Sequence, residues 1–176
     1  MAEQSTAEDP GVYVFAGDHQ MFLLIRGRVT ANEAYALFQH AGKTLDDPEV
    51  HAIWVDMDRC NYIDSTTIGT LIRMQKRVQA RGGKFLIANP SQAVAAIIEK
   101  TKLTQYFSIV NDPAVASAER DLVSKVPVAQ KHLLESSFVL DAHNDIVDAV
   151  PELRPQFEAL IKALAADLQR KQQGQV

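Results

Sequence analysis

Short apolar runs alternate with amphipathic segments along the first 110 residues. The runs are rich in β-branched and aromatic residues and predict strands, whereas the amphipathic segments repeat apolar side chains with a helical period. In chain order the pattern predicts β-β-α-β-α-β-α-β, an α/β fold with a mixed β-sheet and helices packed on it. The expected strands are residues 12–16, 21–25, 52–56, 84–88 and a brief one ending at 110; the expected helices are residues 30–43, 90–98 and a segment from 65 to the glycines at 82 and 83.

Local signals refine three of these elements. Thr30 and Glu33 have the spacing of a capping box, which predicts a helix start at this point. Gly27 is expected to end the second strand. Residues 52–55 are apolar almost without interruption, so this strand is expected to be covered on both faces, like a central strand of an α/β sheet.

The last third of the chain has a different pattern. Beyond residue 112 only helical periodicity is recognisable, around Val115, Leu122 and Val126, then over 128–140, and most strongly over 153–168. The sequence therefore predicts a flexible tail at 1–10, a sheet domain at 11–111 and an all-α C-terminal extension at 112–176. The extension is interpreted first as an add-on that buries its own apolar stripe; alternatively its helices could form a homodimer or bind a partner.

Composition and charge exclude several classes of protein. The net charge of −4 and the scattered basic residues argue against nucleic-acid binding. The single cysteine, Cys60, excludes an intramolecular disulfide framework and fits a reducing compartment. No secretory signal and no run of ~20 apolar residues for a membrane span is recognisable. The five histidines show no close metal-ligand spacing, so a cytoplasmic protein with no membrane contact, metal or cofactor is expected.

The most informative stretch is residues 54–69, a buried strand followed by a polar loop and a helix that begins near Ser65. This arrangement places the Ser65 hydroxyl at the carboxyl edge of the sheet and at a helix N-terminus, where negative charge is well tolerated. We interpret Ser65 as a phosphorylation switch, with Thr66 and Thr67 as secondary sites. The alternative for each hydroxyl is a capping or first-turn role.

The order of elements, together with the motifs at residues 63–69 and 81–87, resembles the STAS domain of anti-sigma factor antagonists. The resemblance covers residues 12–111. It implies that the serine after the aspartate, Ser65 after Asp64, is phosphorylated by a partner kinase of the histidine-kinase-like ATPase type that is also the anti-sigma factor. A PP2C-type phosphatase would reverse the step. The chain departs from the commonest pattern at Thr67, where the family usually has glycine.

The expected partner surface combines the loop before the helix with the helix face that follows it. Phosphorylation would add about −1.5 to −2 charges beside Asp64 and near Asp56 and Asp58, which would repel a partner matched to the unmodified loop. A coupling of about 1–3 kcal/mol would change occupancy about 5- to 150-fold. The basic residues of the helix could equally be a plain solvated face. The candidate partner-binding residues are Asn61, Asp64, Ser65, Thr66, Thr67, Arg73, Lys76 and Arg77.

Two other functions compete with this interpretation. One is a non-switching STAS scaffold or subunit of an ABC transporter or stressosome-like complex. The other is a magnesium-dependent phosphatase that uses Asp56 and Asp58, although Cys60 stands where threonine is expected and no downstream acidic pair completes a metal site. A serine hydrolase is not expected, because Ser65 lacks a Gly-x-Ser-x-Gly turn and no histidine is recognisable as its base. The sequence therefore predicts a regulator, not an enzyme.

Overall fold

A single mixed sheet forms the centre of the molecule in the computed structural model, which describes residues 9–117, 124–128 and 135–174. Its strands run in the order β6-β5-β3-β2-β1-β7, and β4 also pairs with β2. The β1 strand is antiparallel to β2 and β7, and the other pairs are parallel. The strands are β1 (Gly11–Gly17), β2 (Gln20–Val29), β3 (Ala52–Asp56), β4 (Cys60–Ile63), β5 (Lys84–Ala88), β6 (Ser108–Val110) and β7 (Ser124–Lys125).

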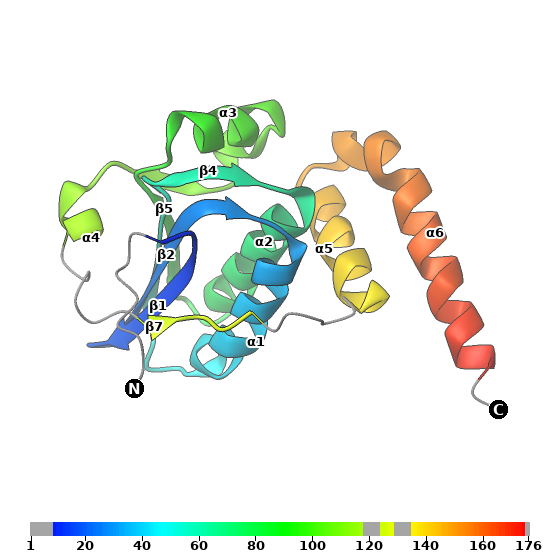
Figure 1. Ribbon diagram of the computed structural model, residues 1–176, viewed down its shortest axis with the longest axis horizontal. Coiled ribbons are helices and arrows are strands. Elements are labelled where there is room, and N and C mark those ends of the chain that lie inside the picture. The colour runs from blue at the N-terminus through cyan, green and yellow to red at the C-terminus, as the bar shows by residue number, and fades with distance from the viewer. Residues whose placement is uncertain (1–8, 118–123, 129–134, 175–176) are drawn as a thin grey trace.

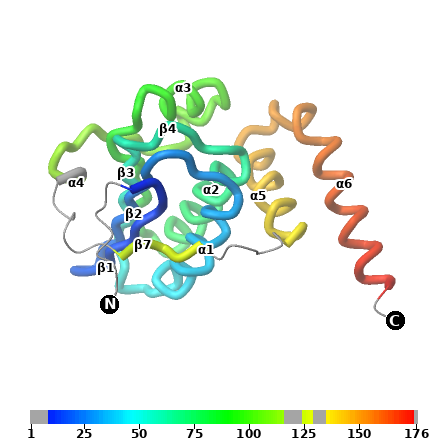
Figure 2. Tube along the Cα trace, viewed as in Figure 1, coloured from blue at the N-terminus to red at the C-terminus, as the bar shows by residue number. Residues whose placement is uncertain are grey.

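The helices form successive layers beside this sheet (Figures 1 and 2). Helices α1 and α2 lie on one face of the sheet, α5 packs against α2 on the side away from the sheet, and α6 is the outermost layer. The long helices are α1 (Ala31–Asp46), α2 (Ser65–Gln79), α3 (Gln92–Lys100), α5 (Ser136–Ala149) and α6 (Arg154–Gln173); the short ones are η1 (Leu103–Gln105), α4 (Pro113–Ser117) and η2 (Pro151–Leu153).

The core lies between the sheet and helices α1 and α2. In β3, Ile53 and Val55 point into this core and are fully buried, whereas Ala52 and Trp54 on the other face are only half-buried. This strand is therefore covered completely on one face and partly on the other, where Asp56 is also buried. The alternation of side chains along a strand gives β3 one fully buried face, because the long helices cover the sheet on that side.

The first 110 residues otherwise follow the predicted order, with one strand added. The capping box is present, and the Glu33 carboxylate accepts a hydrogen bond from the Thr30 amide at 2.8 Å. Gly27 does not end β2. With its positive φ of 67° it forms a bulge, and β2 continues to Val29 and pairs with β4, a strand that was expected to be loop.

In the described part of the C-terminal extension, the regular elements are helices except for β7, and Val126, which was expected to be helical, lies in an irregular segment after β7. This two-residue strand pairs with the edge strand β1 and was not predicted, because two residues carry no recognisable period. Helix α5 begins at Ser136, not near 128 as expected. The predicted tail over 1–8, Leu122, and residues 129–134 of the predicted 128–140 helix lie outside the described residues.

Candidate functional site

Asp64 caps α2 and ties it to α1. One carboxylate oxygen accepts hydrogen bonds from the Thr67 amide and the Thr67 hydroxyl, both at 2.8 Å. The other accepts one from the amide of Ala31, the first residue of α1, at 2.9 Å. Because Asp64 occupies the N-cap position, Ser65 is the first helical residue, and the alternative of Ser65 as a simple cap is wrong.

The Ser65 hydroxyl contacts a histidine from the C-terminal extension. Ser65 Oγ lies 2.9 Å from His143 Nε2, and His143 Nδ1 lies 2.8 Å from the carbonyl oxygen of Val139. A carbonyl only accepts hydrogen bonds, so Nδ1 carries a proton and, in the neutral ring, Nε2 accepts the Ser65 proton. No local sequence pattern predicts this partner, because it is 78 residues away in the chain.

This serine–histidine contact has the spacing of a nucleophile and its base. However, His143 is only 2% exposed, and the ring of Phe157 packs edge-on against it at 5.1 Å between centroids. The Ser65–His143 contact therefore lies at the packed junction of α2, α5 and α6 and joins α2 to α5.

The three candidate hydroxyls differ in accessibility. Ser65 is half-buried, whereas Thr66 and Thr67 are 5% and 1% exposed. The Thr67 hydroxyl is also engaged by Asp64. Modification of either threonine would require the first turn of α2 to open, so Ser65 is the most accessible of the three candidates.

The basic face of α2 contacts α5 and is only partly exposed, with the Arg73 and Lys76 side chains 22% and 40% exposed. Arg73 Nε and Lys76 Nζ each lie 2.8 Å from a carboxylate oxygen of Asp145. Burial by itself would lower the pKa of Lys76, but Asp145 and the more distant Asp148 outweigh it and raise this pKa. The role of these two basic residues in partner binding stays a prediction.

The remaining predicted partner residues lie outside this contact. Arg77 pairs with Asp46 at the end of α1. Asn61 is exposed on β4, near the start of the loop that leads into α2. The structure thus brings Asp64, Ser65 and Asn61 to one end of α2 and places the basic residues farther along the helix.

The acidic pair at the end of β3 is bridged by one arginine. Arg26 lies 2.9 Å from Asp56 and 2.8 Å from Asp58, and both Arg26 and Asp56 are almost completely buried. Burial raises the pKa of Asp56, while hydrogen bonds from Asn89 and Arg26 act in the opposite direction. Carboxylates held in this way are not free to share a magnesium ion and a phosphoryl group, which disfavours the phosphatase interpretation.

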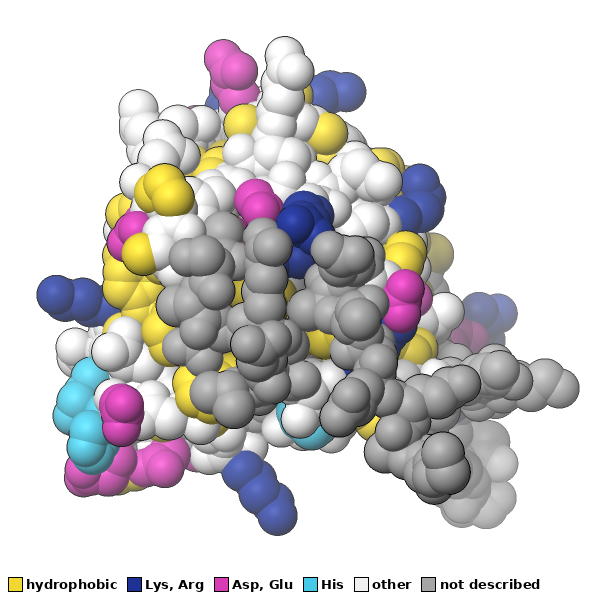
Figure 3. Space-filling model, turned by 60° about the vertical axis from the view of Figure 1, so that its left-hand side comes forward, with side chains coloured by type: hydrophobic (Ala, Val, Ile, Leu, Met, Phe, Trp, Pro, Cys, Tyr) yellow, Lys and Arg dark blue, Asp and Glu magenta, His cyan; other side chains and the backbone are white. Residues whose placement is uncertain are grey.

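The described residues contain neither a candidate metal site nor a candidate membrane span. Within residues 9–117, 124–128 and 135–174, no three His, Cys, Asp or Glu side chains gather where they could hold a metal ion. In the same ranges, no helix has both the length and the apolar character needed to cross a membrane. On the face seen in Figure 3, Lys and Arg side chains are spread around the surface and do not form one patch.

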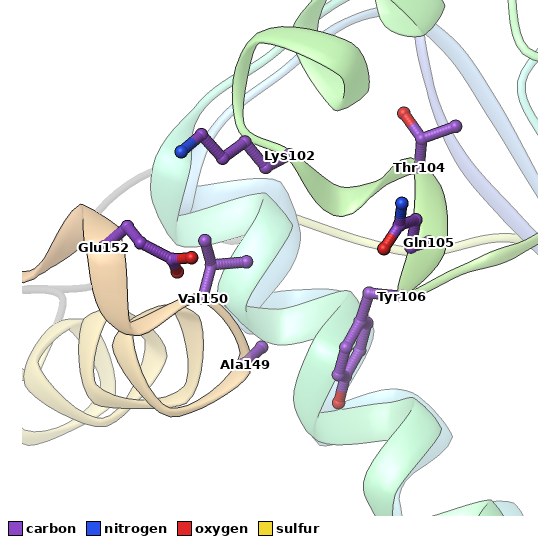
Figure 4. Close-up of a pocket in the computed structure, with 7 residues that line it drawn as sticks. All are labelled: Lys102, Thr104, Gln105, Tyr106, Ala149, Val150 and Glu152. Atoms are coloured by element: carbon purple, nitrogen blue, oxygen red, sulfur yellow. The ribbon is translucent and has the colours of Figure 1, made fainter.

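A cavity of about 530 Å³ opens where the extension meets the sheet domain. Figure 4 shows Val150 and Glu152 on the side of α5 and η2, and Lys102, Gln105 and Tyr106 on the opposite side. The contact between α5 and the sheet domain is therefore open to solvent at this end.

The sequence matches the STAS domain family over residues 9–117, which is more than half of the chain. This chain belongs to the STAS domain family. A candidate anti-sigma factor antagonist of Thermotoga maritima has a similar fold, with a TM-score of 0.52 and 18% identity over 61% of this chain and 92% of its own. The Bacillus cell fate determinant SpoIIAA, in its phosphorylated form, gives a TM-score of 0.50 and 13% identity over 62% of this chain and 100% of its own. Helices α5 and α6 lie outside the family match.

Proposed function

We propose that this protein is an anti-sigma factor antagonist that switches partners when Ser65 is phosphorylated. The observation that carries the proposal is the position of Ser65, as the first residue of α2 directly after the Asp64 cap, in a STAS domain. The unmodified protein would bind a serine kinase of the histidine-kinase-like ATPase type that acts as an anti-sigma factor. The phosphorylated protein would release it.

The local chemistry supports such a switch. The kinase would transfer the γ-phosphoryl group of ATP to Ser65 Oγ: a new O–P bond forms, the bond to the β-phosphate oxygen breaks, and ADP and the hydroxyl proton leave. The N-terminus of α2, where negative charge is favourable, would tolerate the added charge within the fold. A partner facing that charge beside Asp64 would be repelled. A PP2C-type phosphatase would restore the hydroxyl by hydrolysis of the phosphate ester.

The relatives favour a binding function over catalysis. SpoIIAA has been solved in a phosphorylated form, and it shares the STAS-like fold with this chain. We therefore propose a regulator without enzymatic activity of its own, acting in the cytoplasm. The Thr67 departure from the family pattern leaves Ser65 in place.

The test is a capture experiment with two variants of the full chain. Ser65→Ala should retain a kinase-type partner, whereas Ser65→Asp should capture about 5- to 150-fold less of it. The captured protein, with ATP, should then phosphorylate the wild-type chain, and mass spectrometry should locate the phosphate on Ser65. Equal capture by the two variants, or phosphate only at other residues, would contradict the proposal.

The second candidate is a non-switching scaffold or subunit. It is favoured by the contact between Ser65 and His143, which engages the hydroxyl within the chain. In that case the two variants would capture the same partner equally and no phosphate would appear on Ser65. The capture experiment therefore separates the two functions.

A further inference from the structure

Helix α5 approaches α2 so closely that only a glycine fits at the crossing. A Cβ atom at Gly69 would lie 2.1 Å from the carbonyl oxygen of Ala142 and 2.7 Å from its Cα. Gly69 follows Ser65 by one helical turn, so the crossing point and the Ser65–His143 contact lie on the same face of α2. The backbone of α5 therefore rests directly beside the candidate phosphorylation site.

Further contacts hold α5 along this face. Phe138 packs edge-on against Tyr35 of α1 at 5.0 Å between ring centroids and contacts Phe38 at 5.9 Å. Ile146 and Val147 are buried at the other end of α5. Side chains from α1 and α2 thus form one docking face for α5.

The polar part of this docking face is basic and α5 is acidic. Residues 136–149 contain Asp141, Asp145 and Asp148 but no lysine or arginine. Two of these aspartates contact Arg73, at 2.8 and 3.3 Å. A phosphate on Ser65 would add about −1.5 to −2 charges beside this acidic helix. Phosphorylation would also remove the hydroxyl proton that His143 accepts.

We propose that α5 is a built-in competitor of the outside partner. When docked, it contacts Ser65, Arg73 and Lys76 and leaves each of them only partly exposed, so a kinase or an anti-sigma factor must displace α5 to engage this whole face. Phosphorylation of Ser65 and docking of α5 therefore oppose each other, and by linkage each weakens the other by the same factor. The identity of the outside partner rests on the proposed function, but the covering of Ser65 does not.

The chemistry of α5 also describes the partner that could replace it. That partner would present a helix with a small residue opposite Gly69 and carboxylates toward Arg73 and Lys76. It would bind only the fraction of molecules in which α5 is undocked, which lowers its apparent affinity by that fraction. Mutations that release α5 should therefore strengthen partner binding.

The first test replaces Gly69 with alanine and uses Gly42→Ala as a matched control. Alanine favours both helices, and a Cβ at Gly42 would meet nothing within 4 Å, whereas one at Gly69 would collide with α5. Hydrogen exchange of residues 138–148 should become about tenfold faster or more in Gly69→Ala and stay unchanged in Gly42→Ala. Unchanged exchange of α5 in Gly69→Ala would overturn the proposal.

The second test measures whether position 65 is covered, without any kinase. The native Cys60 is fully buried, and burial raises the pKa of its thiol, so it should react slowly with iodoacetamide. In Ser65→Cys the new thiol should also react slowly, and adding Gly69→Ala should accelerate its alkylation about tenfold or more. Equal rates with and without Gly69→Ala would show that α5 does not cover position 65.

The two proposals can fail separately. If position 65 is covered but Ser65 is never phosphorylated, the proposed function fails and α5 remains a cover for this face. If Ser65 is phosphorylated equally fast in wild type and Gly69→Ala, the switch stands and the competitor role of α5 is overturned.

Discussion

Arg26 is a single residue that organises the loop after β3. Its guanidinium group joins Asp56 and Asp58 where almost no water reaches it. Arg26→Met should lower the free energy of unfolding by about 3–5 kcal/mol, because Asp56 would be left buried without its partner. Urea titration measures this loss.

The loss should depend on pH. Burial already raises the pKa of Asp56, and removal of Arg26 should raise it further, so the carboxyl becomes protonated and neutral at a less acidic pH. The penalty is absent below the pKa of the unfolded state, grows as the pH rises from there to the raised folded pKa, and is constant above it. The difference between wild type and Arg26→Met should therefore shrink as the pH falls toward 3.8, the ordinary pKa of an aspartate. A double variant, Arg26→Met with Asp56→Leu, should recover part of the stability; no recovery would contradict this account.

At the scale of elements, Asp145 is the main polar anchor of α5. Its side chain is 15% exposed and contacts both Arg73 and Lys76, whereas Asp148 is 65% exposed and lies 3.8 Å from Lys76. Asp145→Asn should weaken docking of α5 by about 1–2 kcal/mol, and Asp148→Asn by less than about 0.5 kcal/mol. Hydrogen exchange of the α5 amides measures both effects, and equal effects of the two substitutions would contradict this assignment.

The contribution of Lys76 to α5 docking should depend on pH only in the alkaline range. Because the pKa of Lys76 is raised, this contribution should persist at neutral pH and disappear only above about pH 10.5.

The outermost helix, α6, is attached mainly through Phe157. This residue is buried against His143, whereas Leu160 on the same helix is 41% exposed. Phe157→Ala should release α6 at a cost of about 2–4 kcal/mol, and Leu160→Ala should change stability little. Hydrogen-exchange rates of the α6 amides would distinguish the two variants. A large effect of Leu160→Ala would mean that another surface covers Leu160. The predicted homodimer through these helices would provide such a surface, and sedimentation of the full chain tests whether the homodimer forms.

At the scale of the whole molecule, local patterns predicted most of the sheet domain. The β5 strand, the start of α2 and the α1 capping box all depend on residues close together in the sequence. The β4 strand was missed because its pairing depends on a bulge at Gly27 in β2. The contact of Ser65 with His143 of α5 was not predicted, because the two residues are distant in the chain. One available signal was Gly69, because a glycine inside a helical pattern is unfavourable and indicates a packing or functional reason.

The layered arrangement of the molecule makes its unfolding informative. The only tryptophan, Trp54, lies in β3 beside Phe22, so its fluorescence reports on the sheet, while circular dichroism also detects α5 and α6. If the outer helices undock first, the circular dichroism signal should begin to fall at lower urea concentration than the fluorescence signal. Added NaCl should widen this difference, because it screens the contacts of Asp145 with Arg73 and Lys76 but not the apolar core. Transitions that coincide at every salt concentration would mean that α5 unfolds only with the sheet. A helix bound so firmly could not act as a displaceable competitor at Ser65.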